Sequence, residues 1–286
     1  MRSVDRTLEY VVRSARRRGH GIECRMLSSN SDTACRNTRL GHGVTVAPDA
    51  DQTMHKTMRY NTLLFDLDGT LTDPFEGITR CVAYALEGQG ITVTDRAELA
   101  CYIGPPLQQA FEHFHGLDAA QSARALADYR ERFADVGLYE NVVYAGIPEL
   151  LARLTASGRQ LFVATSKPWA YARRIIAHFG LASYFGKVYG SEMDGQRAEK
   201  HALLAYIMRQ QKLKPGETLM IGDRRFDILG ARHNGMDAVA VGYGYGQPEE
   251  LAAAEPLGVF ESPTALGDYL LAPAPVSAPA ETVTIR

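Results

Sequence analysis

The stretch "TLLFDLDGTLTD" at residues 62–73 combines an apolar run with closely spaced acids. A short apolar run, typical of a buried strand, ends in Asp66 and Asp68 with one leucine between them. Carboxylates are costly at the end of a core strand unless something uses them. Because side chains two residues apart in an extended chain point the same way, both acids can face one bound group. Gly69 allows a sharp turn directly after them.

An alternation of strands and helices surrounds this stretch. Further short strands are predicted at residues 158–166, 187–191, 217–223 and 237–244, and amphipathic helices at residues 146–157, 198–211 and 225–235. Strands that alternate with helices predict a parallel sheet covered on both faces. The expected fold class is therefore α/β, with a Rossmann-like core made of residues 58–76 and 144–271.

One segment, residues 77–143, carries only helical signals. Helix-length stretches at 77–90, 105–116 and 119–137 have apolar residues three and four positions apart. They predict a small helical bundle inserted into the core after the first strand. We expect this cap domain to cover an active site, and an independent bundle without a gating role is the alternative.

Composition limits the class of protein. The 286 residues are 45% apolar with a net charge of -2, which gives no sign of a nucleic-acid or membrane surface. The four cysteines lack C-x-x-C spacing, so a disulfide framework or structural zinc site is not expected. Residues 1–57 carry ten Lys/Arg against six Asp/Glu, and we expect a disordered extension there and a flexible tail at 272–286. A cytoplasmic monomer or homodimer is expected.

Polar residues recur where the predicted strands end. Thr165 and Ser166 end the second strand, Asp223 ends the fourth, and Asp227 follows one helical turn later. Lys200 opens a helix after the third strand. Ligands bind outside the carboxyl ends of the strands in open α/β sheets. These segments are therefore expected to meet the acid pair of the first strand at one rim.

The chemistry of these residue types points to a phosphoryl group. Two neighbouring carboxylates support one ionised nucleophile and one acid/base. Asp223 and Asp227 add negative charge, which a hard divalent cation such as Mg²⁺ would balance. Lys200 and the hydroxyl of Thr165 offer positive charge and a donor to an oxyanion.

Four motifs in order carry a resemblance to a known family. "DLDGT" at 66–70, "VATSKP" at 163–168, Lys200, and "IGDRRFD" at 221–227 resemble the haloacid dehalogenase-like hydrolase superfamily. The helical insertion after the first motif is similar to that superfamily's cap with a small helix bundle. The resemblance covers about residues 60–271.

The resemblance implies a role for each matching residue. Asp66 matches the nucleophile that forms an aspartyl-phosphate, and Asp68 matches the acid/base. Thr165 and Lys200 match the phosphate-holding pair, with Ser166 beside them. The implied Mg²⁺ ligands are Asp66, the backbone carbonyl of Asp68, and Asp223. The implied supporting residues are Gly69, Thr70 and Asp227. Arg197 or Lys167 is the alternative to Lys200 as the phosphate contact, and a surface helix charge is the alternative for Asp227.

Segments outside these motifs narrow the resemblance. "YIGPPLQQAF" at 102–111, "YGSEMDGQRAEK" at 189–200 and "VAVGYGYGQPEEL" at 239–251 resemble the phosphoglycolate phosphatase-like branch, most of all its bacterial 5′-nucleotidases. "TSKP" departs from the "TNKP" common in phosphoglycolate phosphatases. The implied substrate is a small phosphorylated metabolite, a nucleoside 5′-monophosphate first. Phosphoglycolate, another small phosphomonoester, a sugar-phosphate mutase and a non-catalytic metabolite-binding protein are the alternatives.

The cap is expected to contact the leaving group of the substrate. Arg80, Tyr102 and Pro105 are the candidates, because an aromatic ring can stack on a base and "IGPP" at 103–106 is suited to a rigid loop that faces the core. A plain helix start is the alternative for the proline pair.

Overall fold

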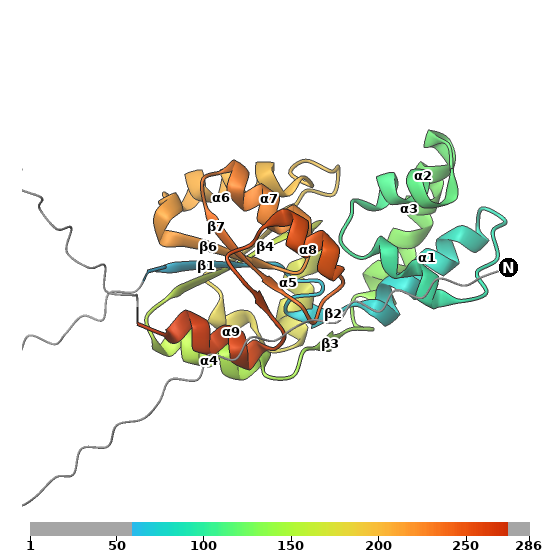
Figure 1. Ribbon diagram of the computed structural model, residues 1–286. Coiled ribbons are helices and arrows are strands. Elements are labelled where there is room, and N and C mark those ends of the chain that lie inside the picture. Colours follow the sequence, from blue (N-terminus) through green and yellow to red (C-terminus); the bar gives the residue numbers. More distant parts are fainter. Residues whose placement is uncertain (1–58, 274–286) are drawn as a thin grey trace, which may run out of the picture. The chain divides into compact units, whose positions relative to one another are not determined.

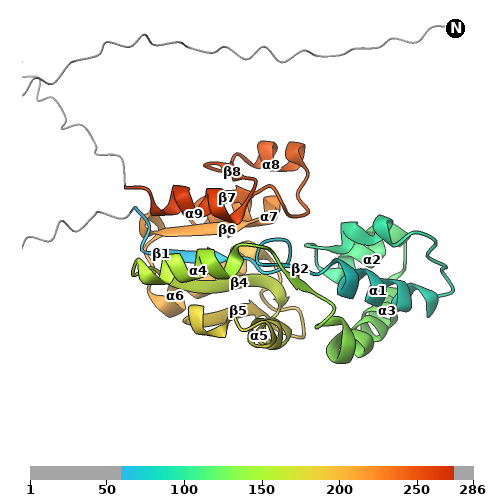
Figure 2. The ribbon, with the colours of Figure 1, turned by 90° about the horizontal axis from the view of Figure 1, so that it is seen from below.

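A parallel sheet forms the centre of the computed structural model, which describes residues 59–273. The sheet has six strands in the described residues, in the order β5-β4-β1-β6-β7-β8 (Figure 2). The strands are β1 (Thr62–Phe65), β4 (Gln160–Pro168), β5 (Lys187–Ser191), β6 (Thr218–Gly222), β7 (Asp237–Val241) and β8 (Val259–Phe260). This confirms the expected α/β fold class.

Helices cover both faces of the sheet because alternate strand residues point to opposite sides. Leu63 and Phe65 belong to one apolar cluster and Leu64 to the other. The first cluster contains residues of α4 (Ile147–Ala156), α5 (Trp169–His178) and α9 (Pro263–Leu271), and the second contains residues of α6 (Lys200–Gln211), α7 (Arg225–His233) and α8 (Pro248–Ala254). Figure 1 shows α4 and α9 below the sheet and α6 and α7 above it.

The register of the strands aligns the ends of three motifs. Phe65 pairs with Val163 of β4 on one side and with Ile221 of β6 on the other. Asp66 therefore follows β1 at the level where β4 and β6 also approach their carboxyl ends. The parallel sheet thus delivers the polar residues of neighbouring segments to one edge.

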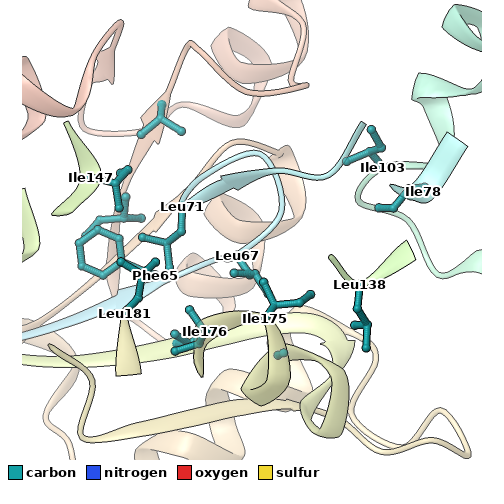
Figure 3. Packing of buried hydrophobic residues seen from close by; sticks show 14 of the residues in the cluster. Phe65, Leu67, Leu71, Ile78, Ile103, Leu138, Ile147, Ile175, Ile176 and Leu181 are labelled. Carbon is teal, nitrogen blue, oxygen red and sulfur yellow. The ribbon is translucent and has the colours of Figure 1, made fainter. Parts of the chain in front are cut away.

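Leu67 fixes the turn that follows β1. Its side chain is fully buried, and its carbonyl oxygen accepts hydrogen bonds from the backbone N–H groups of Thr70, Leu71 and Thr72. Figure 3 shows Leu67 and Leu71 in the apolar cluster that includes Ile175 of α5. Because Leu67 points into this core, the acids on either side of it are held on the opposite, polar side.

The inserted segment is helical, as the expected fold class requires. It contains α1 (Phe75–Glu87), a 3₁₀ turn Arg96–Tyr102, α2 (Leu107–His115) and α3 (Ala119–Arg132). Figures 1 and 2 both show α1, α2 and α3 gathered beside the sheet. The helix expected at 119–137 instead changes at Phe133 into a π-helical turn that ends at Gly137. The domain limits given above stay a prediction.

A second, two-stranded sheet joins the inserted helices to the core. β2 (Thr72–Asp73) pairs antiparallel with β3 (Val142–Val143). The chain therefore leaves and re-enters the core through adjacent segments. The sequence does not predict this pair, because two residues are too few to show a period.

Several expectations fall outside what the structure describes. The extension over residues 1–57 and most of the tail over 272–286 lie outside residues 59–273. No helix within the described part of the chain has the length and apolarity to cross a lipid bilayer. The cytoplasmic location and the monomeric or homodimeric state stay predictions.

Gly77 provides a test of the contact between α1 and the π-helical turn. A Cβ at Gly77 would lie 2.2 Å from the carbonyl oxygen of Gly137 and 2.8 Å from that of Glu140. Gly→Ala normally stabilises a helix interior by about 1 kcal/mol. We expect Gly77→Ala instead to destabilise the protein, by about 1–3 kcal/mol, because rigid backbone must shift. Thermal unfolding measures this as a melting temperature lower by several degrees.

Gly216→Ala is the matched control, because a Cβ there meets nothing within 4 Å. Its melting temperature should stay close to that of the parent protein. A rise in the melting temperature of Gly77→Ala would contradict the close packing described here.

Candidate active site

Asp66 is held by two donors at the end of β1. Its Oδ1 accepts a hydrogen bond from the backbone N–H of Leu67 at 2.8 Å and lies 3.2 Å from Nζ of Lys200. Only 8% of Asp66 is exposed. Two donors on one oxygen fix the orientation of the carboxylate while Oδ2 has no protein hydrogen bond within residues 59–273.

Lys200 lies between two carboxylates and a backbone carbonyl. Its Nζ is 2.6 Å from Oδ1 of Asp227, 3.2 Å from Oδ1 of Asp66, and donates to the carbonyl oxygen of Ala164 at 2.8 Å. Burial by itself lowers the pKa of Lys200, but the two carboxylates outweigh burial and raise it. The residue is thus an ammonium ion locked inside the site, where it screens the repulsion between the carboxylates.

Asp223, Asp227 and Asp66 form an acidic cluster. One carboxylate oxygen of each lies within 4.8 Å of the others. Oδ2 of Asp223 accepts from the backbone N–H of Tyr245 at 2.8 Å, whereas its buried Oδ1 has no hydrogen-bond partner. Burial, then the charges of Asp227 and Asp66, raise the pKa of Asp223 well above its usual value. Burial also raises the pKa of Asp227, to about 6.

Asp68 pairs with a different lysine. Its Oδ2 lies 2.9 Å from Nζ of Lys167, and its buried Oδ1 has no hydrogen-bond partner. Burial raises the pKa of Asp68 in spite of the opposing charge of Lys167. The ring of Phe133, from the π-helical turn of the cap, lies 4.4 Å from the same Nζ. A carboxyl group with a raised pKa is better suited to give and take a proton than one with an ordinary pKa.

The residues expected to hold phosphate lie beside this pair. Thr165 is buried, and its Oγ1 accepts from the backbone N–H of Lys167 at 3.2 Å. Ser166 uses its backbone carbonyl to accept from the hydroxyl of Ser191 at 2.9 Å. Thr70 is fully buried next to Gly69, and its hydroxyl oxygen has no hydrogen-bond partner.

Gly69 leaves room for Asp223. Its φ of +78° lies in the left-handed region, and a Cβ built on it would lie 2.0 Å from Oδ2 of Asp223. Gly244 is also close, since a Cβ there would meet both Asp223 and the carbonyl oxygen of Gly69 at 2.4 Å. The two glycines allow two backbone segments to enclose one carboxylate.

A cavity of about 660 Å³ extends from these residues to the cap. Asp66, Asp68 and Lys167 line it from the core, and Tyr102 and Pro105 line it from the cap. Such a volume is typical of a pocket for a small organic ligand.

The structure separates the three cap residues expected to contact the leaving group. Tyr102 lines the cavity but is only 1% exposed, and its hydroxyl lies 2.7 Å from Nδ1 of His115. Arg80 does not line the cavity. It forms ion pairs with Glu76 at 2.9 Å and Glu140 at 2.6 Å near the β2–β3 connection. Of the three, Tyr102 and Pro105 are therefore the ones placed to meet a ligand.

The charge of the site fits a divalent cation. Of the four carboxylates described above, Asp66 and Asp227 form ion pairs with Lys200 and Asp68 with Lys167, whereas Asp223 forms none among the described residues. When all four are ionised, two negative charges are left over. The buried, unpaired Oδ1 of Asp223 and the all-oxygen donor set suit Mg²⁺.

Sequence reasoning missed or undervalued three contacts. Lys167 was predicted only as an alternative to Lys200 for the phosphate contact. In the structure, Lys167 pairs with Asp68 and Lys200 pairs with Asp66. Tyr245 supports Asp223 from the loop after β7, and Arg224 contacts the cap. The motif "TSKP" contained a signal for Lys167, but no local signal marks the other two, because their partners are distant in sequence.

A model of the family described as "Haloacid dehalogenase-like hydrolase" matches residues 63–241. The chain belongs to this family. The resemblance expected from the four motifs is thus confirmed for this hydrolase, which is an α/β protein with a helical cap.

Relatives of this hydrolase are named for phosphoryl chemistry. A "5′-nucleotidase" of Pseudomonas aeruginosa is 50% identical over 70% of this chain and 90% of that protein. "Tyrosine-protein kinase PtkA" of Mycobacterium tuberculosis is 39% identical over 65% of this chain, which spans 64% of the kinase. A "Phosphoglycolate phosphatase" of Vibrio vulnificus is 28% identical over 73% of this chain and 95% of its own.

A solved structure agrees with these relatives. A predicted phosphatase from Clostridium acetobutylicum is 40% identical, with a TM-score of 0.72 over 74% of this chain and 98% of its own. The match in family, relatives and fold identifies this hydrolase as an enzyme, a phosphomonoesterase of the phosphoglycolate phosphatase-like branch.

Gly69 and Gly90 together test the packing around Asp223. We expect Gly69→Ala to lower phosphatase turnover by at least about 100-fold, because its Cβ would displace the carboxylate of Asp223. Gly90→Ala has a similar φ, +79°, but meets nothing within 4 Å. It carries the same backbone strain, about 1–2 kcal/mol, without touching the site.

Steady-state phosphate release and thermal unfolding compare the two variants. Similar losses of stability with a loss of turnover in Gly69→Ala alone would support the close approach. Equal turnover in both variants would contradict it.

Proposed function

We propose that this hydrolase is a Mg²⁺-dependent 5′-nucleotidase that acts through an aspartyl-phosphate on Asp66. The observation that carries the mechanism is that the two acids form ion pairs with different lysines, Asp66 with Lys200 and Asp68 with Lys167. Asp66 lies beside the buried ammonium group of Lys200. The pKa of Asp68 is raised, which suits proton transfer.

The first half-reaction uses both acids. The free Oδ2 of Asp66 attacks phosphorus, and the bond between phosphorus and the ester oxygen breaks. Asp68 gives its proton to the leaving oxygen, so the nucleoside departs as an alcohol. Thr165 and Lys200 stabilise the phosphoryl oxygens, and Ser166 lies beside them.

The second half-reaction returns the enzyme to its starting state. Asp68, now ionised, takes a proton from water, and the water oxygen attacks phosphorus. The bond to Asp66 breaks and inorganic phosphate leaves.

Mg²⁺ would be held by Asp66, Asp223 and the backbone carbonyl of Asp68, with Asp227 alongside. It would supply the positive charge that lets a carboxylate approach a phosphate dianion. The two uncompensated charges of the cluster and the unpaired Oδ1 of Asp223 support this assignment.

Two observations favour a nucleotide as the substrate. The relative named as a 5′-nucleotidase is 50% identical along most of its length. The cavity of about 660 Å³ has room for a nucleoside next to the phosphoryl site, and aromatic side chains, Tyr102 and Tyr129, line it. Phosphoglycolate, with a much smaller leaving group, would leave most of this space to water, and it is the second candidate.

A substrate panel tests the assignment. Purified protein with Mg²⁺ is assayed for phosphate release from the nucleoside 5′-monophosphates, a 3′-monophosphate, phosphoglycolate and glucose 6-phosphate. We expect kcat/KM for at least one 5′-monophosphate to exceed that for phosphoglycolate by about tenfold or more. The reverse order would replace the nucleotidase with a phosphoglycolate phosphatase.

The same assay on Asp66→Asn tests the mechanism. An amide is not a nucleophile here, so turnover should fall by about 1000-fold or more while the fold is retained. Activity equal to that of the parent would refute the aspartyl-phosphate.

Removal of metal tests the role of the acidic cluster. We expect EDTA to abolish turnover and Mg²⁺ to restore it. Mg²⁺ should also raise the melting temperature of the parent protein, because a ligand that binds only the folded state stabilises it. Asp223→Asn should lose this rise, and Asp268→Asn, at an exposed ion pair with Arg153, should keep it.

Turnover that survives thorough chelation would contradict the metal site. So would an equal rise in melting temperature for Asp223→Asn and the parent.

A further inference from the structure

Arg224 reaches from the core to the cap. It directly follows Asp223, and its backbone N–H donates to Oδ2 of Asp227 at 3.2 Å. In its side chain, Nη1 donates to the backbone carbonyl oxygen of Ile103 in the cap. One residue therefore touches both the acidic cluster, through its backbone, and the cap, through its side chain.

Glu250 of α8 orients this side chain. Its Oε1 accepts from Nε of Arg224 at 2.9 Å and its Oε2 from Nη2 at 3.3 Å, and the two side chains are only 15% and 13% exposed. Oε1 also accepts from the backbone N–H of Arg225 at 3.0 Å. A planar guanidinium gripped in this bidentate way has its remaining nitrogen aimed in a fixed direction.

The cap loop at 103–106 is shaped to receive the guanidinium. Gly104 has a φ of +111°, and a Cβ there would lie 2.8 Å from Nη1 of Arg224. The next two residues, Pro105 and Pro106, line the cavity together with Gly104. The loop is thus both a wall of the cavity and the part of the cap that Arg224 holds.

We propose that Arg224 is a positioning residue that latches the cap loop at 103–106 over the phosphoryl site, with Glu250 holding Arg224 in place. The inference rests on the proposed phosphomonoesterase site and adds how the cap loop is held in a fixed position relative to the core. A loop held in one position keeps water out and fixes the leaving group relative to the acids. Because the contact is to a backbone carbonyl, the latch does not depend on the side chain at 103.

Hydrogen exchange measures the latch directly. In the full chain, we expect Arg224→Met and Glu250→Gln to speed amide exchange in peptides that span residues 99–110, and to leave peptides from β4 and β6 unchanged. Arg225→Met is the matched control. The exposed side chain of Arg225 stacks on Phe226 at 5.1 Å and makes no hydrogen bond or ion pair with the described residues of the cap. The Arg225→Met variant should show the same amide exchange rates at residues 99–110 as the parent protein.

Kinetics measure what the latch does. On the best phosphomonoester from the substrate panel, Arg224→Met should lose about 10- to 100-fold in kcat/KM, as a small misplacement of the substrate does. The melting temperature of Arg224→Met should fall, because Glu250 loses its partner, and Arg225→Met should keep the parent's kcat/KM. The double variant Arg224→Met, Glu250→Gln should be no slower than Arg224→Met, because the proposed effect of Glu250 on the cap loop passes through the side chain of Arg224.

Unchanged exchange at residues 99–110 in Arg224→Met would overturn the latch, whatever the kinetics. An equal kinetic loss in Arg225→Met would show a general effect of positive charge and would also overturn it. Multiplied losses in the double variant would overturn the role of Glu250. A parent protein that releases no phosphate would refute the proposed function. The latch would still be tested by the exchange measurement, because that measurement needs no substrate.

Discussion

The interaction on which the site depends is the repulsion among four carboxylates gathered at one edge of the sheet. Two buried lysines offset part of it, Lys200 between Asp66 and Asp227, and Lys167 on Asp68. Burial, together with the remaining repulsion from Asp227 and Asp66, raises the pKa of Asp223, and one oxygen of this carboxylate has no hydrogen-bond partner. The folded protein holds these charges together at a cost in free energy, and a site of this kind is suited to bind a cation and a phosphoryl group.

The sheet is what imposes this arrangement. The fully buried Leu67 anchors the turn after β1, so the acids on either side of it stay on the polar edge. The parallel register brings the ends of β4 and β6 to the same level as the end of β1. Gly69 and Gly244 then let two backbone segments close around Asp223. Apolar packing, rather than the ionic contacts, thus supplies the stability that keeps the charges in place.

In the proposed mechanism, the cap makes a general phosphoryl site selective. The core residues that line the cavity would suit any phosphate, whereas Tyr102 and Pro105, which line it from the cap, would meet the leaving group. Relatives in one family are named as a nucleotidase, a phosphoglycolate phosphatase and a tyrosine kinase. This variety is expected when a shared core is combined with different walls, because the fold alone does not set the substrate.

The fold class, the helical insertion and the edge at which the acids of "DLDGT" and "IGDRRFD" gather could be predicted from the sequence. This was possible because strand alternation, helical periodicity and the order of short motifs are local patterns. The folded structure was needed to show which lysine pairs with which acid, that Arg80 lies in ion pairs away from the cavity, and that Arg224 reaches Ile103. Those contacts join residues tens to more than a hundred positions apart, and their geometry depends on how the helices and the cap pack, which no local pattern encodes.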